Sequence, residues 1–145
     1  MLLKHLVGET TSFMVNGQDY ATPDGTCIRD YLHVEDIVRA HVQALQHVRD
    51  EVGYCEVFNL GTGKGYSVKE LIQVSEQITG HRGNIQYEEQ RTGDSAILIA
   101  NADKARVLLG WESMYSIKDM VKTAWAWHSE KEMEFLRDGA VWSKL

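Results

Sequence analysis

The sequence lacks the features that mark several classes of protein. It has one proline, Pro23, and only two cysteines, Cys27 and Cys55, which do not lie at a metal-ligand spacing. No window approaches the roughly 18 consecutive apolar residues that a membrane span needs. The N-terminal stretch also lacks the apolar run and the small-residue cleavage site of a signal peptide. We therefore expect reduced thiols, a cytoplasmic location and no membrane partner.

A block of charge of one sign is missing as well. The chain has 15 Lys and Arg against 21 Asp and Glu, a net charge of −6, and its basic residues are scattered. A nucleic-acid partner is therefore not expected. The six histidines form neither HxH nor HExxH, so no metal site is expected. With 43% hydrophobic and 25% charged residues over 145 positions, residues 1–145 are predicted to form one globular unit.

Apolar periodicity and turn formers divide the chain into alternating strands and helices, which predicts an α/β fold. We expect strands at 12–15, 27–34, 55–60 and 85–89. We expect helices from about 34 to 48, 67 to 79 and 102 to 110, and a last helix that begins at about 116. Ser67 to Glu70 and Ser116 to Asp119 have the spacing of capping boxes, and Gly80 and Gly110 mark helix ends. In the first of these helices, one apolar stripe is predicted to face the core: Val34, Val38, His41, Val42, Leu45 and Val48.

The stretch from Cys27 to Val34 alternates like a strand but carries an arginine in its middle. Because side chains alternate between the two faces of a strand, Arg29 should share a face with Tyr31 and His33. Spacing alone favours a solvated ion pair between Arg29 and Asp30 over an anion-binding role.

A glycine-rich turn, GTGKG, occupies residues 61–65, between a predicted strand and a predicted helix. Its glycines have the spacing GxGxG, whereas dinucleotide-binding turns have GxGxxG. Lys64 is followed by Gly65, so the phosphate-binding pattern GxxxxGK[ST] is missing too. We interpret the stretch as a tight strand-to-helix turn and expect no cofactor-binding residue in it.

Several segments, in order along the chain, resemble the UDP-glucose 4-epimerase (UDP-galactose 4-epimerase) family of extended short-chain dehydrogenases/reductases. They are DYATPDGTCIRDYLHVEDIVRAHVQAL, VFNLGTGKGYSVKELI, QRTGD, ANADKARVLLGW and AWAWH. The resemblance runs from about residue 12 to 128 and covers only the C-terminal part of such enzymes. It implies that residues 1–145 are the substrate-binding C-terminal portion of the fold, with the N-terminal Rossmann half missing.

The resemblance also implies roles for five residues. Arg29 and Arg91 match arginines that bind the diphosphate of the UDP-sugar, and Asp94 matches a ligand of the uridine ribose. Guanidinium groups suit a diphosphate because they donate paired, charge-assisted hydrogen bonds. Asn16 stands where a phenylalanine beside the uracil is common, and Leu98 stands at a sugar-pocket position that is often Tyr or Cys.

The family interconverts UDP-glucose and UDP-galactose in galactose metabolism and uses NAD as its hydride carrier. Its GxxGxxG turn for NAD and its catalytic Tyr-x-x-x-Lys pair do not occur in this sequence. The resemblance therefore implies a fragment that grips the UDP-sugar, has no catalytic or NAD-binding residue, and is inactive alone. The complete enzyme is expected to be a homodimer. Two alternatives stay open: a fragment of a related nucleotide-sugar dehydratase or epimerase, and a non-catalytic remnant or interaction protein.

Overall fold

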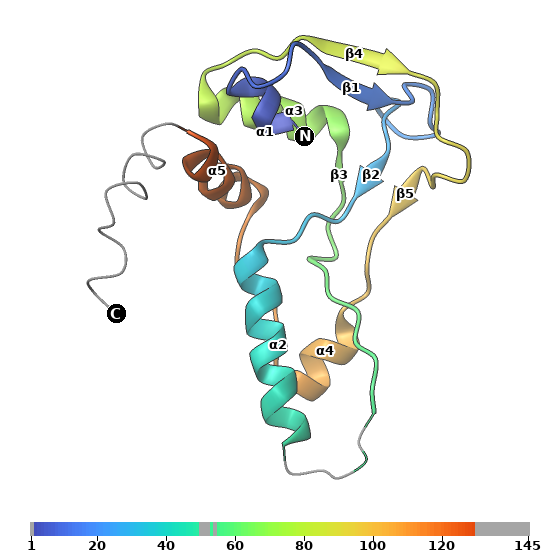
Figure 1. The fold of residues 1–145 in the computed structure, drawn as a ribbon. Coiled ribbons are helices and arrows are strands. Elements are labelled where there is room, and N and C mark those ends of the chain that lie inside the picture. The colour runs from blue at the N-terminus through green and yellow to red at the C-terminus, as the bar shows by residue number, and fades with distance from the viewer. Residues whose placement is uncertain (1, 50–52, 54, 130–145) are drawn as a thin grey trace, which may run out of the picture.

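The computed structural model describes residues 2–49, 53 and 55–129 (Figure 1). The elements are α1 (Leu2–Leu6), β1 (Phe13–Asn16), β2 (Ile28–Arg29), α2 (Val34–Val48), β3 (Tyr66–Ser67), α3 (Val68–Thr79), β4 (Ile85–Glu88), β5 (Ile97–Leu98), α4 (Asp103–Leu109) and α5 (Ile117–His128). Among these described residues, no helix is long and apolar enough to cross a membrane. The predicted α/β class is confirmed.

The strands form two small sheets. In the first, β1 pairs with β4 in parallel, and Phe13 lies opposite Ile85. In the second, β2 is the central strand, antiparallel to β3 and parallel to β5. Figure 1 shows this second sheet between two ends of the molecule, with β1, β4, α1 and α3 at one end and α2 and α4 at the other.

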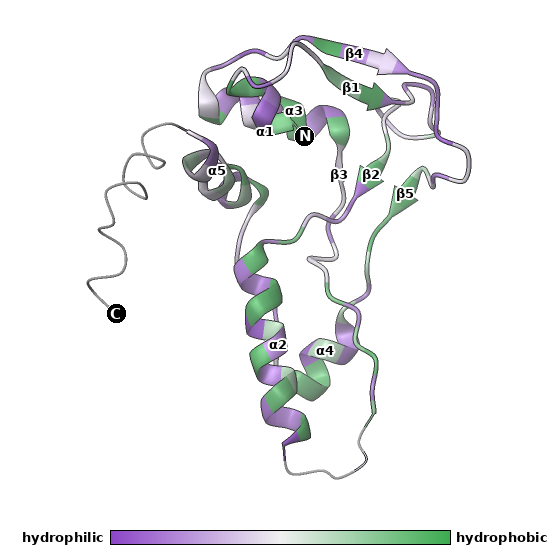
Figure 2. Ribbon diagram, in the orientation of Figure 1, coloured by the Kyte–Doolittle hydropathy of each residue, from purple (hydrophilic) through white to green (hydrophobic). Residues whose placement is uncertain are grey.

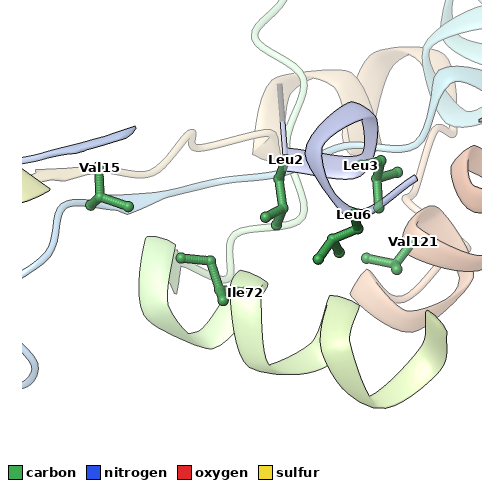
Figure 3. Packing of buried hydrophobic residues seen from close by; sticks show 6 residues of the cluster. All are labelled: Leu2, Leu3, Leu6, Val15, Ile72 and Val121. Carbon is green, nitrogen blue, oxygen red and sulfur yellow. The ribbon is translucent and has the colours of Figure 1, made fainter. Parts of the chain in front are cut away.

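The larger hydrophobic core lies where α1, β1, α3 and α5 meet (Figure 3). Its buried members are Leu2, Leu3, Leu6, Val15, Ile72 and Val121. Full burial of such a side chain stabilises the fold by roughly 1.5–3 kcal/mol. This core therefore fixes the β1–β4 sheet on the helices beneath it. A smaller core of Ala40, Ala105 and Trp111 joins α2 to α4.

The starts of α3 and α5 are set by capping boxes, as the sequence predicts. The Ser67 hydroxyl accepts a hydrogen bond from the Glu70 backbone N–H (3.0 Å), and the Glu70 carboxylate accepts one from the Ser67 N–H (2.7 Å). Ser116 and Asp119 repeat this arrangement at α5. Gly80 closes α3 with a φ of 73°, a left-handed conformation that glycine adopts at little cost.

Asp24 ties the loop after β1 to the start of α3. Its carboxylate accepts hydrogen bonds from the Thr26 N–H (2.8 Å), the Thr26 hydroxyl (2.7 Å) and the Ser67 hydroxyl, while the Lys69 ammonium donates to the Asp24 backbone carbonyl (2.6 Å). Burial alone would raise the pKa of Asp24, but the bonds from Ser67 and Thr26 and the charge of Lys69 outweigh it. The pKa of Asp24 is therefore lowered.

The outer face of α2 contradicts one prediction. Most of the stripe expected to face the core is exposed: Val34 by 66%, Val38 by 55%, Val42 by 48% and Leu45 by 68%, while Val48 at its end is half-buried. The buried residues of α2 are instead Asp36 and Ala40 (Figure 2 shows the hydropathy along the helix). His41 is exposed too, and its Nδ1 lies 2.8 Å from the Ile37 carbonyl oxygen. No element of the described chain covers this apolar stripe.

The strand predicted at 55–60 is not formed either. These residues make no strand ladder, and Val57 is 77% exposed. Phe58 and Leu60 pack beside the smaller core. A strand requires a neighbouring strand for its backbone hydrogen bonds. Within the described residues, none lies beside this segment.

Candidate functional site

The stretch around Arg29 is a strand for two residues only. His33 then caps α2: its Nδ1 accepts a hydrogen bond from the Glu35 N–H (3.1 Å), and its ring stacks on Tyr115 with centroids 4.1 Å apart. The predicted strand 27–34 is therefore wrong beyond Arg29, because the chain leaves the sheet to start a helix. His33 serves as a cap, and the expected shared face of Arg29, Tyr31 and His33 is not formed.

The Arg29 side chain is held by three acceptors. Its Nη1 donates to the carbonyls of Ile28 (2.9 Å) and Ser95 (2.7 Å), and its Nη2 donates to the Asp94 carboxylate (2.8 Å). A guanidinium has five N–H donors. One N–H on Nε and one on Nη2 therefore have no acceptor within the described part of the chain. Both unpaired N–H groups can donate charge-assisted hydrogen bonds to an oxyanion.

Asp94 is therefore the ion-pair partner of Arg29, and the Arg29–Asp30 pair that spacing favoured is wrong. The Asp94 N–H donates to the Arg91 carbonyl (3.1 Å), so the two residues share one tight turn. The Arg91 side chain is exposed, and no hydrogen bond or ion pair holds it among the described residues.

Tyr20 supports Asp94 and was missed by sequence reasoning. Its hydroxyl lies 3.5 Å from Asp94 Oδ2, and the ring is 7% exposed. Burial, together with the negative charge of Asp94, raises the pKa of Tyr20, so its phenol stays protonated and can donate to the carboxylate. The two residues are 74 positions apart. No spacing pattern signals a contact over that distance.

Leu98 and Asn16 lie near the two ends of the loop that carries Arg91 and Asp94. In the parallel pairing of β2 with β5, Arg29 lies opposite Leu98, which is 62% exposed. Asn16 lies opposite Glu88 in the β1–β4 sheet and donates a side-chain bond to it (3.2 Å). The loop 89–96, which carries Arg91 and Asp94, joins β4 to β5. The structure thus brings Arg29, Asp94 and Leu98 together, with Asn16 where the loop begins.

The glycine turn is bonded to Asp30. The Asp30 carboxylate accepts from the Thr62 N–H (2.9 Å), the Thr62 hydroxyl (2.6 Å), the Gly63 N–H (3.0 Å) and the Ala100 N–H (3.3 Å). Gly63 has a φ of 70°. A carboxylate of the chain itself thus occupies two backbone amides of the turn. Within the part of the chain that the structure describes, no group of three or more His, Cys, Asp or Glu residues is placed to hold a metal ion.

Comparison with protein families and curated proteins gives a consistent result. The sequence model of the family described as GDP-mannose 4,6 dehydratase matches residues 10–124. The UDP-glucose 4-epimerase of Halalkalibacterium halodurans is 47% identical over 131 residues, which cover 90% of this chain and 39% of that protein. The enzyme of the same name from Rhizobium meliloti is 47% identical over 125 residues, covering 86% of this chain and 38% of that protein.

Solved structures agree with the sequences. The UDP-glucose 4-epimerase of Bifidobacterium longum, in complex with NAD+ and UDP, has a TM-score of 0.84 and 40% identity, covering 89% of this chain and 38% of that one. The enzyme of Stenotrophomonas maltophila, with bound NAD and formylated UDP-arabinopyranose, has a TM-score of 0.85 and 40% identity, covering 92% of this chain and 39% of that one. The chain thus spans less than half the length of the relatives it matches.

Proposed function

The chain belongs to the GDP-mannose 4,6-dehydratase family of extended short-chain dehydrogenases/reductases, and we propose that it is the UDP-sugar-binding C-terminal part of a UDP-glucose 4-epimerase. One observation carries the proposal. Arg29 keeps unpaired N–H groups on Nε and Nη2 beside Asp94, in a chain that is 47% identical to such an epimerase over 90% of its length. The two arginines supply positive charge locally, although the whole chain carries a net charge of −6.

The part of the UDP-sugar that each residue is proposed to bind follows from its hydrogen-bond donors and acceptors. Arg29 and Arg91 donate to the diphosphate, because both keep guanidinium N–H groups free for it. The Asp94 carboxylate keeps acceptor capacity beyond its bonds to Arg29 and Tyr20, and it accepts from the ribose hydroxyls. Asn16 lies toward the uracil and Leu98 toward the sugar. Leu98 and Arg29 are cross-strand neighbours, so the residues that contact the sugar and the diphosphate are adjacent in the sheet.

The hydride chemistry belongs to the complete enzyme. The Bifidobacterium longum and Brucella ovis relatives are described in complex with NAD+ or NAD, which supports NAD as the cofactor. When bound, NAD would supply the hydride acceptor for oxidation at C4 of the sugar. The sequence contains no Tyr-x-x-x-Lys pair and no GxxGxxG turn. We therefore propose that this chain grips the substrate and does not catalyse the reaction alone.

Three surfaces support packing against a further part of such an enzyme. The stripe on α2 is exposed, and the apolar segment 55–60 has no strand partner among the described residues. A mostly apolar cleft of about 840 Å³ lies between residues 31–35 and helices α1, α3 and α5. Residues 1–145 would then form one part of a larger unit. The homodimer and the cytoplasmic location stay predictions.

A related nucleotide-sugar dehydratase or epimerase is the second candidate, and the description of the matching family favours it. A preference for a thymidine or guanosine nucleotide would argue against the first candidate. A non-catalytic remnant would bind no nucleotide at all.

The test uses this chain fused to the N-terminal part of the Bifidobacterium longum relative, called the joined enzyme below. We expect it to convert UDP-galactose to UDP-glucose and to bind UDP more tightly than dTDP or GDP in competition calorimetry. Preference for dTDP or GDP would favour the second candidate. A folded joined enzyme that binds no nucleotide would overturn the proposed function.

A further inference from the structure

Asp30 connects three segments that are distant in sequence. It directly follows β2, it accepts from Thr62 and Gly63 in the glycine turn, and it accepts from Ala100 just after β5. Its own backbone N–H donates to the Leu98 carbonyl (3.2 Å). Each bond to a carboxylate is charge-assisted and is stronger than a bond between neutral groups.

The glycines of the turn allow this approach. A Cβ at Gly61 would lie 2.5 Å from Asp30 Oδ2 and 2.6 Å from the Ala100 Cβ. A Cβ at Gly65 would lie 2.3 Å from the Ile28 Cγ2. All three distances are shorter than a van der Waals contact. The glycine spacing that does not fit a dinucleotide site is thus accounted for by the close fit of the turn against β2.

Asp30 and its neighbour Arg29 hold β5 at both of its ends. Arg29 donates to the Ser95 carbonyl before β5, and Asp30 accepts from the Ala100 N–H after it. Between these bonds, the Ile28 N–H donates to the Ala96 carbonyl (2.8 Å). Loss of the Asp30 bonds would leave β2 free to shift against β5. The unpaired N–H groups of Arg29 would shift with it.

We propose that Asp30 is a positioning residue for the UDP-sugar. By clamping β2 to the glycine turn and to the end of β5, it sets where Arg29 meets the diphosphate. This inference rests on the proposed function, because it needs Arg29 to bind phosphate. Asp30 itself touches no ligand in this arrangement and acts through Arg29.

Asp30→Asn in the joined enzyme tests the role. Asparagine has the same shape, but its amide group would place a donor among the N–H donors of Thr62, Gly63 and Ala100. We expect the Kd for UDP to rise about tenfold, the equivalent of roughly one lost hydrogen bond to a charged group. The Kd for NAD should change less than about twofold, since the proposed cofactor site lies outside this chain.

A double-mutant cycle separates positioning from general stability. In an Arg29→Ala background, Asp30→Asn should change the Kd for UDP less than about twofold, because the residue through which Asp30 acts is gone. Asp24→Asn is the matched control: it removes a carboxylate that also bonds to neighbouring backbone and hydroxyl groups but not to Arg29. It should lower the melting temperature without weakening UDP binding.

Several outcomes would overturn the inference. Equal losses of UDP affinity with and without Arg29, or parallel losses of UDP and NAD affinity, would assign Asp30 a purely structural role. If Asp30→Asn does not fold, Thr62→Val removes the 2.6 Å hydroxyl bond to Asp30, together with the two 3.1 Å bonds between that hydroxyl and the Lys64 backbone, and leaves the backbone N–H bonds to Asp30 in place. It should give a smaller loss in the same direction. An unchanged Kd for UDP in that variant would count against positioning. A wild-type joined enzyme that fails to bind UDP would remove the proposed function and this role together.

Discussion

The Arg29 guanidinium donates to the Asp94 carboxylate over 2.8 Å, although 65 residues separate them in the sequence. The side chains are 22% and 35% exposed, so this ion pair adds little stability, at most about 1 kcal/mol. Its main effect is geometric. It fixes the guanidinium while the Nε N–H has no acceptor among the described residues, so the proposed site would need little rearrangement to receive a diphosphate.

Removal of either arginine should weaken nucleotide binding. In the joined enzyme, Arg29→Ala and Arg91→Ala should each reduce UDP binding by ~1.5–3 kcal/mol, the usual loss for a hydrogen bond to a charged group. Calorimetry with UDP and with NAD measures both affinities, and the NAD affinity should equal that of the unsubstituted joined enzyme. Arg106→Ala is the control, since Arg106 pairs with Asp103 on the exposed surface of α4. An NAD loss as large as the UDP loss would contradict the assigned roles.

The glycine turn gives a matched pair of variants. Gly63 has a φ of 70° and open space where an added methyl group would lie, so Gly63→Ala should cost about 1 kcal/mol through backbone conformation. Gly61→Ala should cost more, because its Cβ would lie 2.5 Å from Asp30 Oδ2. Urea unfolding measures both costs. Weaker NAD binding by Gly63→Ala with an unchanged melting temperature would instead show direct contact with the cofactor.

Asp24 should contribute to stability in a pH-dependent way. Its pKa lies below the ordinary value of about 3.9, because hydrogen bonds and Lys69 stabilise the charged form. Its contribution is therefore fully present above that ordinary value and is lost as the pH falls through the lowered one. Asp24→Asn should lower the melting temperature at neutral pH and flatten its fall below about pH 4. Melting curves in which wild type and variant fall in parallel would contradict this.

The isolated 145-residue chain should not convert UDP-galactose and should not retain NAD, because its sequence contains no Tyr-x-x-x-Lys pair and no GxxGxxG turn. It should also associate or melt at low temperature, since α2 and segment 55–60 expose apolar side chains. An activity assay with added NAD, light scattering and thermal melting measure these properties. Turnover would overturn the functional proposal, whereas a cooperative monomer would overturn only the folding claim.

A paired substitution on α2 sharpens that test. Val38→Lys together with Leu45→Lys should reduce association of the isolated chain, because both side chains are exposed there. The same pair should destabilise the joined enzyme if the added part covers this face. If the pair changes the melting temperature of the isolated chain and of the joined enzyme by the same amount, the added part does not cover this face.

Local signals in the sequence predicted local structure. The Ser67 and Ser116 caps and the glycine ends of α3 and α4 involve residues a few positions apart, and all of them are confirmed. Such signals depend on hydrogen bonds within one helix turn. The short elements α1, β3 and β5 were missed, because two to five residues carry no measurable periodicity.

The failures are non-local. The stripe on α2 and the run at 55–60 are apolar, as predicted, but their burial depends on partners that the described chain does not supply. The site shows the same limit. The resemblance named Arg29 and Asp94, yet their ion pair, the support from Tyr20 and the clamp by Asp30 join residues that only the fold brings together.

The loop 89–96 connects two different sheets, because β4 pairs with β1 and β5 pairs with β2. A fully extended chain from Glu88 to Ile97 could reach roughly 30 Å, so the number of residues in this loop limits how far apart the two sheets can stand. Deletion of one loop residue outside Arg91 and Asp94 would leave every side chain of the proposed site chemically intact and still alter the spacing of Arg91 from Arg29. Under the proposed function, loop length alone would then be able to change nucleotide-sugar affinity without a change in any residue assigned to the site.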